Sequence, residues 1–212
     1  MDHVYELENR RLYLCVDWRD DMSSFLRDVL RGGVDVVQLR AKLANDEQLR
    51  KAARLMLPLC HDFGVPFIVN DSPQLALDVG ADGVHVGQDD LGVAQCRQLL
   101  GDDAIVGLST HATVEFDRAL EEPATYLSAG PIVPTPTKQG RPGTGVEYAV
   151  QCRRRSDRPV FVTGGVNADN VADLVAAGLD HFVVVRALTE SPDPYASARE
   201  LHDSIERALA QR

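Results

Sequence analysis

Short runs of β-branched and apolar residues alternate along the chain with longer segments in which apolar residues recur every three or four positions. The short runs are apolar on both faces, which is typical of strands buried in a parallel sheet. There are eight, beginning at Leu12, Val34, Pro66, Gly83, Ala104, Tyr126, Pro159 and His181. Helix-like segments lie between and after these runs, so the pattern predicts eight β/α units.

Start and stop signals mark the best-defined helical segments. Residues 45–64 and 167–178 each begin with Asn or Asp and end with glycine, and Pro194 opens the last apolar stripe. Asn and Asp accept backbone hydrogen bonds at helix starts, glycine suits helix ends, and proline suits the first turn. Pro58 lies inside the first of these segments and is expected to kink it unless the packing is adapted to it.

Eight strands joined by helices require parallel pairing, and a repeat of about 25 residues suits a closed (β/α)8 barrel. An open doubly wound sheet is the alternative. The chain has no Gly-x-Gly-x-x-Gly after the first run and no Pro- or Gly-rich linker, which favours the barrel. The sequence therefore predicts an α/β fold, a single TIM barrel domain over residues 1–212, with its chemistry where strands end and helices have yet to begin.

Composition and charge narrow the class of ligand. The chain has 212 residues, 44% of them hydrophobic, and a net charge of −10 without a block of Lys or Arg. Binding of nucleic acid is therefore not expected, and any bound anion should be small and held locally. A charged N-terminus and the lack of an apolar run of about 18 residues predict a cytoplasmic protein without membrane association. The four scattered cysteines suit neither structural zinc nor a disulfide framework.

Acidic residues follow two neighbouring strands of the predicted barrel. Asp71 comes directly after "PFIVN", and Asp89 and Asp90 follow "GVHVGQ". Because adjacent strand ends converge, a small set of carboxylates without Cys or His ligands is expected there and suits Mg²⁺, which often bridges to phosphates. The alternative is that Asp71 and Asp90 cap the helices that follow them.

Positive charges follow the second run. Gln38, Arg40 and Lys42 alternate with apolar residues and would share one face if the strand continued to Lys42. Together with a carboxylate-held Mg²⁺, such a face would neutralise a diphosphate. The alternative is a strand that emerges into solvent with ordinary surface charges.

Two loops are candidates for binding an anion. "TGG" at 163–165, together with 185–187 after the last run, resembles the phosphate site that many barrels form after strands 7 and 8. "GPIVPTPTKQG" at 130–140 sets Lys138 among prolines that restrict the backbone. This second loop is either a surface turn or an anion cradle.

The histidines are expected to be mostly structural. His85 lies within an apolar run and is predicted to be a hydrogen-bonded residue of the barrel interior, whereas His61, His181 and His202 are expected at the surface or on helices. His111 is nearer the rim and is a minor candidate for the site. No histidine is assigned to a metal.

Six motifs carry a resemblance to a known family. They are "QLRAK", "ND", "HVGQDD", "GLSTH", "GPIVPTPTK" and "TGGV". In this order and spacing they resemble thiamine-phosphate synthase over almost the whole chain. The resemblance implies a (β/α)8 barrel and a Mg²⁺-dependent transferase of thiamine biosynthesis. Its substrates would be two small molecules, 4-amino-2-methyl-5-(diphosphooxymethyl)pyrimidine and a thiazole phosphate, which give thiamine phosphate and diphosphate.

The resemblance also implies a role for each matched residue. Asp71 and Asp90 would hold Mg²⁺. The pyrimidine diphosphate would be bound by Gln38, Arg40, Lys42, Asn70, Ser109 and Lys138. The thiazole phosphate would be bound by Thr135 and Thr137 and by the backbone of Gly165, Val185 and Arg186. The catalytic residues would be Arg40, Lys42 and Lys138, which stabilise the leaving diphosphate while a pyrimidine cation forms.

One departure and two alternatives qualify the resemblance. Arg186 replaces the family's usual serine after the last strand, which removes a hydroxyl, keeps a backbone N–H and adds a guanidinium. A thiazole tautomerase-like isomerase of this fold would lack the metal carboxylates and the loop lysine. A non-catalytic phosphate-binding regulator would keep the barrel and lose turnover. The presence of Asp71, Asp90 and Lys138 favours the transferase, and self-association as a homo-oligomer stays open.

Overall fold

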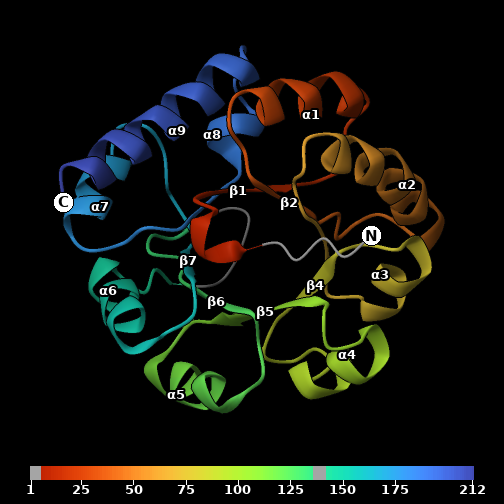
Figure 1. Ribbon diagram of the computed structural model, residues 1–212, viewed down its shortest axis with the longest axis horizontal. Helices are drawn as coiled ribbons and strands as arrows, with labels where there is room; N and C mark the ends of the chain where they lie inside the picture. Colours follow the sequence, from red (N-terminus) through yellow and green to blue (C-terminus); the bar gives the residue numbers. More distant parts are fainter. Residues whose placement is uncertain (1–5, 136–141) are drawn as a thin grey trace.

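The computed structural model describes residues 6–135 and 142–212. Its strands are all parallel and pair in chain order, and the last pairs with the first, so the barrel is closed. Helices surround the strands (Figure 1). The strands are β1 (Leu12–Val16), β2 (Val36–Leu39), β3 (Phe67–Asn70), β4 (Gly83–Val86), β5 (Ile105–Thr110), β6 (Tyr126–Ala129), β7 (Val160–Val162) and β8 (Phe182–Val184). The (β/α)8 barrel is confirmed, and each strand coincides with one of the eight runs, with β5 extending one residue beyond its run.

The helices begin largely where the sequence signals place them. They are α1 (Met22–Arg31), α2 (Asp46–Asp62), α3 (Pro73–Val79), α4 (Val93–Leu100), α5 (Thr113–Glu121), α6 (Val146–Arg155), α7 (Val171–Ala176), α8 (Arg186–Thr189) and α9 (Pro194–Ala210). Asn45 and Gln48 exchange side-chain to backbone hydrogen bonds at the start of α2, both of 2.9 Å, and α2 continues through Pro58. In the described part of the chain, no helix has the length and apolar character needed to cross a membrane.

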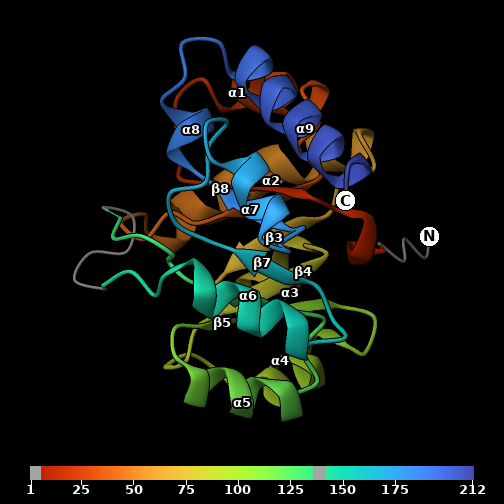
Figure 2. The ribbon, with the colours of Figure 1, turned by 90° about the vertical axis from the view of Figure 1, so that its left-hand side faces the viewer.

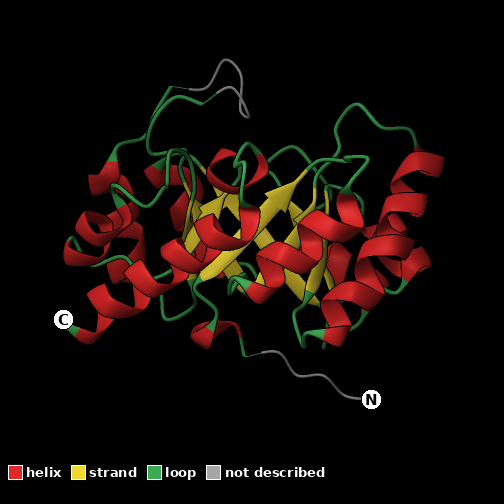
Figure 3. Cartoon of the chain, turned by 90° about the horizontal axis from the view of Figure 1, so that it is seen from above, coloured by secondary structure: helices red, strands yellow, loops and turns green. Residues whose placement is uncertain are grey.

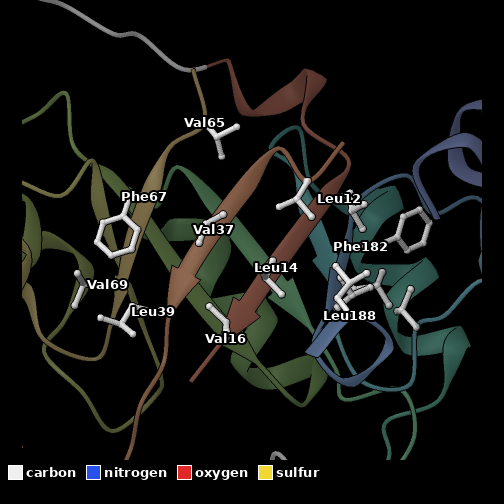
Figure 4. Packing of buried hydrophobic residues seen from close by; sticks show 14 of the residues in the cluster. Leu12, Leu14, Val16, Val37, Leu39, Val65, Phe67, Val69, Phe182 and Leu188 are labelled. Carbon is white, nitrogen blue, oxygen red and sulfur yellow. The ribbon is translucent and has the colours of Figure 1, made fainter. Parts of the chain in front are cut away.

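Alternate residues of each strand face two different cores. On β1, Leu12, Leu14 and Val16 belong to the large cluster between strands and helices, part of which Figure 4 shows, whereas Tyr13 faces the barrel interior. The interior cluster consists of Leu7, Tyr13, Val36, Ile68, Ile105, Tyr126 and Phe161, with Val183 packed against it. Its composition, with two buried tyrosines, makes the interior partly polar.

A short helix closes one end of the barrel. This helix, η1 (Leu7–Asn9), inserts Leu7 into the interior cluster. Figures 2 and 3 show η1 at the end of the barrel opposite the loops that follow the strands. The carboxyl ends of the strands therefore form the open face, which is where barrel enzymes carry their sites.

His181 departs from the sequence prediction, which placed it at the surface or on a helix. It is buried, with Nδ1 2.8 Å from Oδ1 of Asp180 and its ring edge-on to Phe161. Arg153 also donates to Asp180, at 2.8 and 2.9 Å. Burial would raise the pKa of Asp180, but the hydrogen bonds from His181 and Arg153 outweigh it and hold that pKa below its usual range. Arg153 and Phe161, which are distant in sequence, together with the adjacent Asp180 allow a histidine to be buried just before β8.

Candidate active site

Asp71 and Asp90 lie together at the open face. The pKa of Asp71 is raised first by burial and then by the charge of Asp90, while Lys42 lowers it. Nζ of Lys42 is 3.4 Å from Oδ2 of Asp71. Two carboxylates from neighbouring strand ends, with one ammonium beside them, therefore share one spot, as the sequence predicted.

The backbone of Asp71 is held in an unusual conformation. Its φ of 62° is the single positive value at a non-glycine residue in the described chain. Its N–H donates to the carbonyl of His85 at 2.8 Å, which pins this turn to β4. Such conformations cost about 1–3 kcal/mol and tend to cluster at functional sites. Here the turn brings the carboxylate next to Asp90.

Neither carboxylate caps the helix that follows it. Ser72 caps α3, with its Oγ accepting a hydrogen bond from the N–H of Leu75 at 3.2 Å. Gly92 occupies the cap position of α4, and Oδ2 of Asp90 instead accepts from the N–H of Gly87 at 2.7 Å. The capping alternative is therefore wrong for both residues.

The donor set at this spot fits Mg²⁺. Within residues 6–135 and 142–212, no three His, Cys, Asp or Glu side chains gather as ligands, so Asp71 and Asp90 stand as a pair of carboxylates. Mg²⁺ commonly takes one or two carboxylates and completes its shell with waters and substrate phosphates. A cation would also relieve the repulsion that raises the pKa of Asp71.

Gln38, Arg40 and Lys42 do not share one exposed face. The strand ends at Leu39, so the condition that it continue to Lys42 is not met. Gln38 is buried in the barrel interior, Arg40 is half-buried, and Lys42 is exposed and pairs with Asp71. The N–H of Arg40 donates to Val16 at 2.8 Å, which keeps its backbone in the barrel wall. The chain leaves the wall after Arg40, and this breaks the alternation.

Asn70 and Ser109 lie on β3 and β5, the two strands that flank β4. Asn70 is the last residue of β3 and pairs in register with His85 on β4. Ser109 lies near the end of β5 and is buried, with its carbonyl accepting from Nε2 of Gln88 at 2.7 Å. Asn70 is half-buried and directly precedes Asp71, whereas Ser109 is buried.

The two candidate anion loops pack against each other. The N–H of Ile132, after β6, donates to the carbonyl of Thr163, at the end of β7, at 2.8 Å. A Cβ on Gly165 would overlap Val133, and φ of Gly165 is 81°, so glycine is required there. Thr135 ends the described part of the first loop. Residues 136–141, which include Thr137 and Lys138, lie outside the described residues.

Val185 and Arg186 follow the strand next to that of Gly165. Strands β7 and β8 are paired neighbours in the barrel. Val185 is the residue before α8, and Arg186 is the exposed first residue of that helix. The structure thus places the loops after β6, β7 and β8 in one sector of the open face, and the carboxylates after β3 and β4 in another.

Comparisons with known proteins agree with this arrangement. The family model described as thiamine monophosphate synthase matches residues 12–188. The chain belongs to this family. It is 42% identical to a thiamine-phosphate synthase from Acidothermus cellulolyticus over 92% of this chain and 94% of that protein. The thiamine phosphate pyrophosphorylase of Pyrococcus furiosus superposes with a TM-score of 0.85 at 26% identity, covering 98% of each chain.

Some members of the thiamine monophosphate synthase family are longer than this chain. A thiamine-phosphate synthase from Thermosynechococcus vestitus is 38% identical over 92% of this chain, which spans 56% of that relative. The resemblance carried by the six motifs is confirmed, and with it the prediction of a thiamine-phosphate synthase, a transferase.

The structure of this chain also shows buried polar residues that the sequence analysis did not pick out as part of a site. Oγ1 of Thr163, at the end of β7, is buried without a hydrogen-bond partner among the described residues. Tyr13 and Tyr126 hydrogen-bond each other in the barrel interior at 2.9 Å. The motif "TGG" predicts a phosphate site made of backbone N–H groups, and it gives no signal for the hydroxyl of Thr163. Two tyrosines far apart in sequence give no local signal of their contact.

Proposed function

We propose that this chain joins 4-amino-2-methyl-5-(diphosphooxymethyl)pyrimidine to a thiazole phosphate at the open face of the barrel. The products are thiamine phosphate and diphosphate. The observation that carries the proposal is the pairing of Asp71 with Asp90 beside Lys42, in a member of the thiamine monophosphate synthase family. The isomerase alternative would have no use for this carboxylate pair.

The diphosphate is the part of the substrate that this pair is suited to hold. Mg²⁺, when bound by Asp71 and Asp90, neutralises negative charge on the diphosphate. Lys42 and Arg40 add positive charge from the end of β2, and Asn70 offers its amide beside them. We assign Gln38 and Ser109 to the pyrimidine side, deeper in the barrel, and Lys138 to the diphosphate.

Stabilising the leaving group is sufficient for the chemistry. The bond between the pyrimidine methylene carbon and the diphosphate oxygen breaks, and the diphosphate leaves with the electron pair. The electron-rich aminopyrimidine carries the resulting cation, and the thiazole nitrogen then donates its lone pair to form the new C–N bond. No proton is transferred, so the site needs charge stabilisation and close placement of the two reactants rather than a general base.

The thiazole phosphate belongs in the sector formed by the loops after β6, β7 and β8. Support comes from the contact between those first two loops and from the left-handed backbone of Gly165. We assign Thr135, Thr137 and the backbone of Gly165, Val185 and Arg186 to its phosphate. Backbone N–H groups in this sector are the usual phosphate ligands of barrel enzymes.

Arg186→Ala is expected to raise the KM for the thiazole phosphate by about five- to tenfold, the effect of one charge-assisted hydrogen bond. The KM for the pyrimidine diphosphate should change less than twofold, because Asp71 and Asp90 lie in the other sector. Steady-state kinetics with each substrate varied in turn measure both values. Arg154→Ala, which removes an exposed arginine from α6, is the matched control. Equal responses to both substrates would remove Arg186 from the phosphate site.

Purified protein with both substrates and Mg²⁺ is expected to release diphosphate and form thiamine phosphate in equal amounts. Chelation of the metal should stop both, and added Mg²⁺ should restore them. Coupled detection of diphosphate and separation of thiamine phosphate by chromatography give the two measurements. Neither product at saturating substrate would favour the regulator. Conversion of the thiazole alone, without diphosphate release, would favour the isomerase.

A further inference from the structure

A continuous chain of hydrogen-bonded side chains crosses the barrel interior and ends below the open face. Its links are Cys15 Sγ to Gln38 Oε1 (3.3 Å), Gln38 Nε2 to Tyr13 Oη (2.8 Å), Tyr13 Oη to Tyr126 Oη (2.9 Å), Tyr126 Oη to His85 Nδ1 (2.9 Å) and His85 Nε2 to Ser109 Oγ (2.8 Å). All six side chains are buried. This interior chain therefore exchanges few of its hydrogen bonds with solvent.

The amide of Gln38 sets the direction of the first half. Its Oε1 accepts from the thiol of Cys15, so Nε2 is the end that faces Tyr13. An amide nitrogen donates and does not accept, so Oη of Tyr13 must accept from it. The proton of Tyr13 is then directed at Oη of Tyr126. Burial raises the pKa of both phenols, so both keep their protons.

The same reasoning sets the second half. Tyr126 accepts from Tyr13, so its own proton is directed at Nδ1 of His85, which must be unprotonated. A neutral imidazole then carries its proton on Nε2 and donates it to Oγ of Ser109. Oγ of Ser128 donates to the same oxygen at 3.4 Å. Ser109 thus receives hydrogen bonds from within the barrel and keeps its own proton for an acceptor elsewhere.

We propose that this chain is a directed relay that holds Ser109 as a hydrogen-bond donor toward an anionic ligand, with Gln38, Tyr13, Tyr126 and His85 as positioning residues. A hydroxyl that donates attracts phosphate oxygens, whereas one that presents its lone pairs repels them. The direction of the relay follows from the orientation of the Gln38 amide. Its use at the ligand end rests on the proposed function, which puts Ser109 at the pyrimidine diphosphate.

The surrounding packing keeps the relay in one geometry. The rings of His85 and Tyr126 stack with centroids 5.5 Å apart and 24° between their planes. Phe161 meets both tyrosines edge-on, at 5.2 Å. Gly107 lies opposite, where a Cβ would overlap Tyr126. The rings therefore have little room to rotate, and their hydrogen-bonding atoms stay in place.

The tautomer of His85 tests the direction without any turnover. In protein labelled with ¹⁵N-histidine, long-range proton–nitrogen correlation shows which ring nitrogen bears the proton. The chain has 6 histidines, and His85→Gln identifies the signals that belong to His85. We expect a neutral ring protonated at Nε2. A proton on Nδ1, or on both nitrogens, would mean that the relay runs the other way and would overturn the proposal.

A double-mutant cycle tests the action through Ser109. Binding of inorganic diphosphate with Mg²⁺ is measured by calorimetry for the wild type, Tyr126→Phe, Ser109→Ala and the double variant. Tyr126→Phe should weaken binding at least about fivefold when Ser109 is present and less than about twofold in the Ser109→Ala background, because only coupled residues are non-additive. Equal factors in both backgrounds would show that Tyr126 acts only on packing.

Two further variants keep the test decisive. Tyr148→Phe removes a phenol that hydrogen-bonds Thr110 and Ala112 on the outside of the barrel, and should leave both the His85 tautomer and diphosphate binding unchanged. Tyr13→Phe serves if Tyr126→Phe does not fold, and it should loosen the tautomer preference. If His85 is protonated at Nε2 and the double-mutant cycle shows coupling, but no thiamine phosphate forms, the relay is supported and the proposed function is refuted. Failure of diphosphate to bind the wild type would overturn the ligand-end role.

Discussion

Asp71→Asn and Asp90→Asn are each expected to lower kcat/KM at least a hundredfold, a loss of about 2.7 kcal/mol of transition-state stabilisation. Each change keeps the shape of the side chain and removes one negative charge from the pair that would hold Mg²⁺. Asn at position 90 can still accept from Gly87, so the turn that it closes should survive. The loss should therefore come from the metal and leave the fold intact.

Activity measured over a range of Mg²⁺ concentrations checks this prediction. Both variants should need more Mg²⁺ for half-maximal activity, and calorimetry should show weaker binding of Mg²⁺ with diphosphate. Asp89→Asn is the matched control, because it removes the same charge one residue away on the same exposed loop. Wild-type rates in both variants would refute the metal assignment. If Asp89→Asn lost as much activity as Asp71→Asn and Asp90→Asn, the loss would come from the net charge of the loop rather than from the metal.

The pH dependence of metal binding should follow the raised pKa of Asp71. Protons compete with Mg²⁺ for this carboxylate, so affinity should rise with pH and reach its plateau above the range of an ordinary aspartate. Lys42 opposes this shift by favouring the charged form. If a bound ligand draws Lys42 away from Asp71, only the metal is left to keep Asp71 in its charged form.

The sequence predicts the barrel well because each strand has apolar residues on the face toward the helices and is bounded by helix signals. Tyr126, for example, opens a strand that is buried throughout. The ends of the strands are harder to predict. The alternation of Gln38, Arg40 and Lys42 continues in the sequence, although the chain has left the barrel wall after Arg40. The pattern fixes the direction of side chains only while the residues remain in a strand.

The carboxylate pair could be predicted because its members follow adjacent strands. The relay could not, since its central contact joins Tyr13 to Tyr126, which are 113 positions apart. In the structure both tyrosines face inward, but which inward residues meet depends on the register around the closed barrel. His181 was misplaced for the same reason, because Arg153 and Asp180 come together only in the folded chain.

Gly107→Ala is expected to destabilise the protein by about 3 kcal/mol, through overpacking and through loss of a buried hydrogen bond. A Cβ at this position would overlap the ring of Tyr126 and approach Nδ1 of His85. Neither ring can move aside, because Phe161 and the stacking contact hold them. For a chain of this size the melting temperature should fall by about 6–12 °C.

Thermal unfolding followed by circular dichroism measures this fall, and Gly64→Ala is the control. Gly64, unlike Gly107, has a left-handed backbone, with φ of 65°, and an added Cβ there would meet nothing within 4 Å. Its substitution should cost only about 1 kcal/mol of backbone strain. Equal melting temperatures for the two variants would show that the interior has room beside Tyr126. A larger fall in Gly107→Ala, with a mixed His85 tautomer, would show that one glycine supports both the packing of the barrel and the direction of the relay.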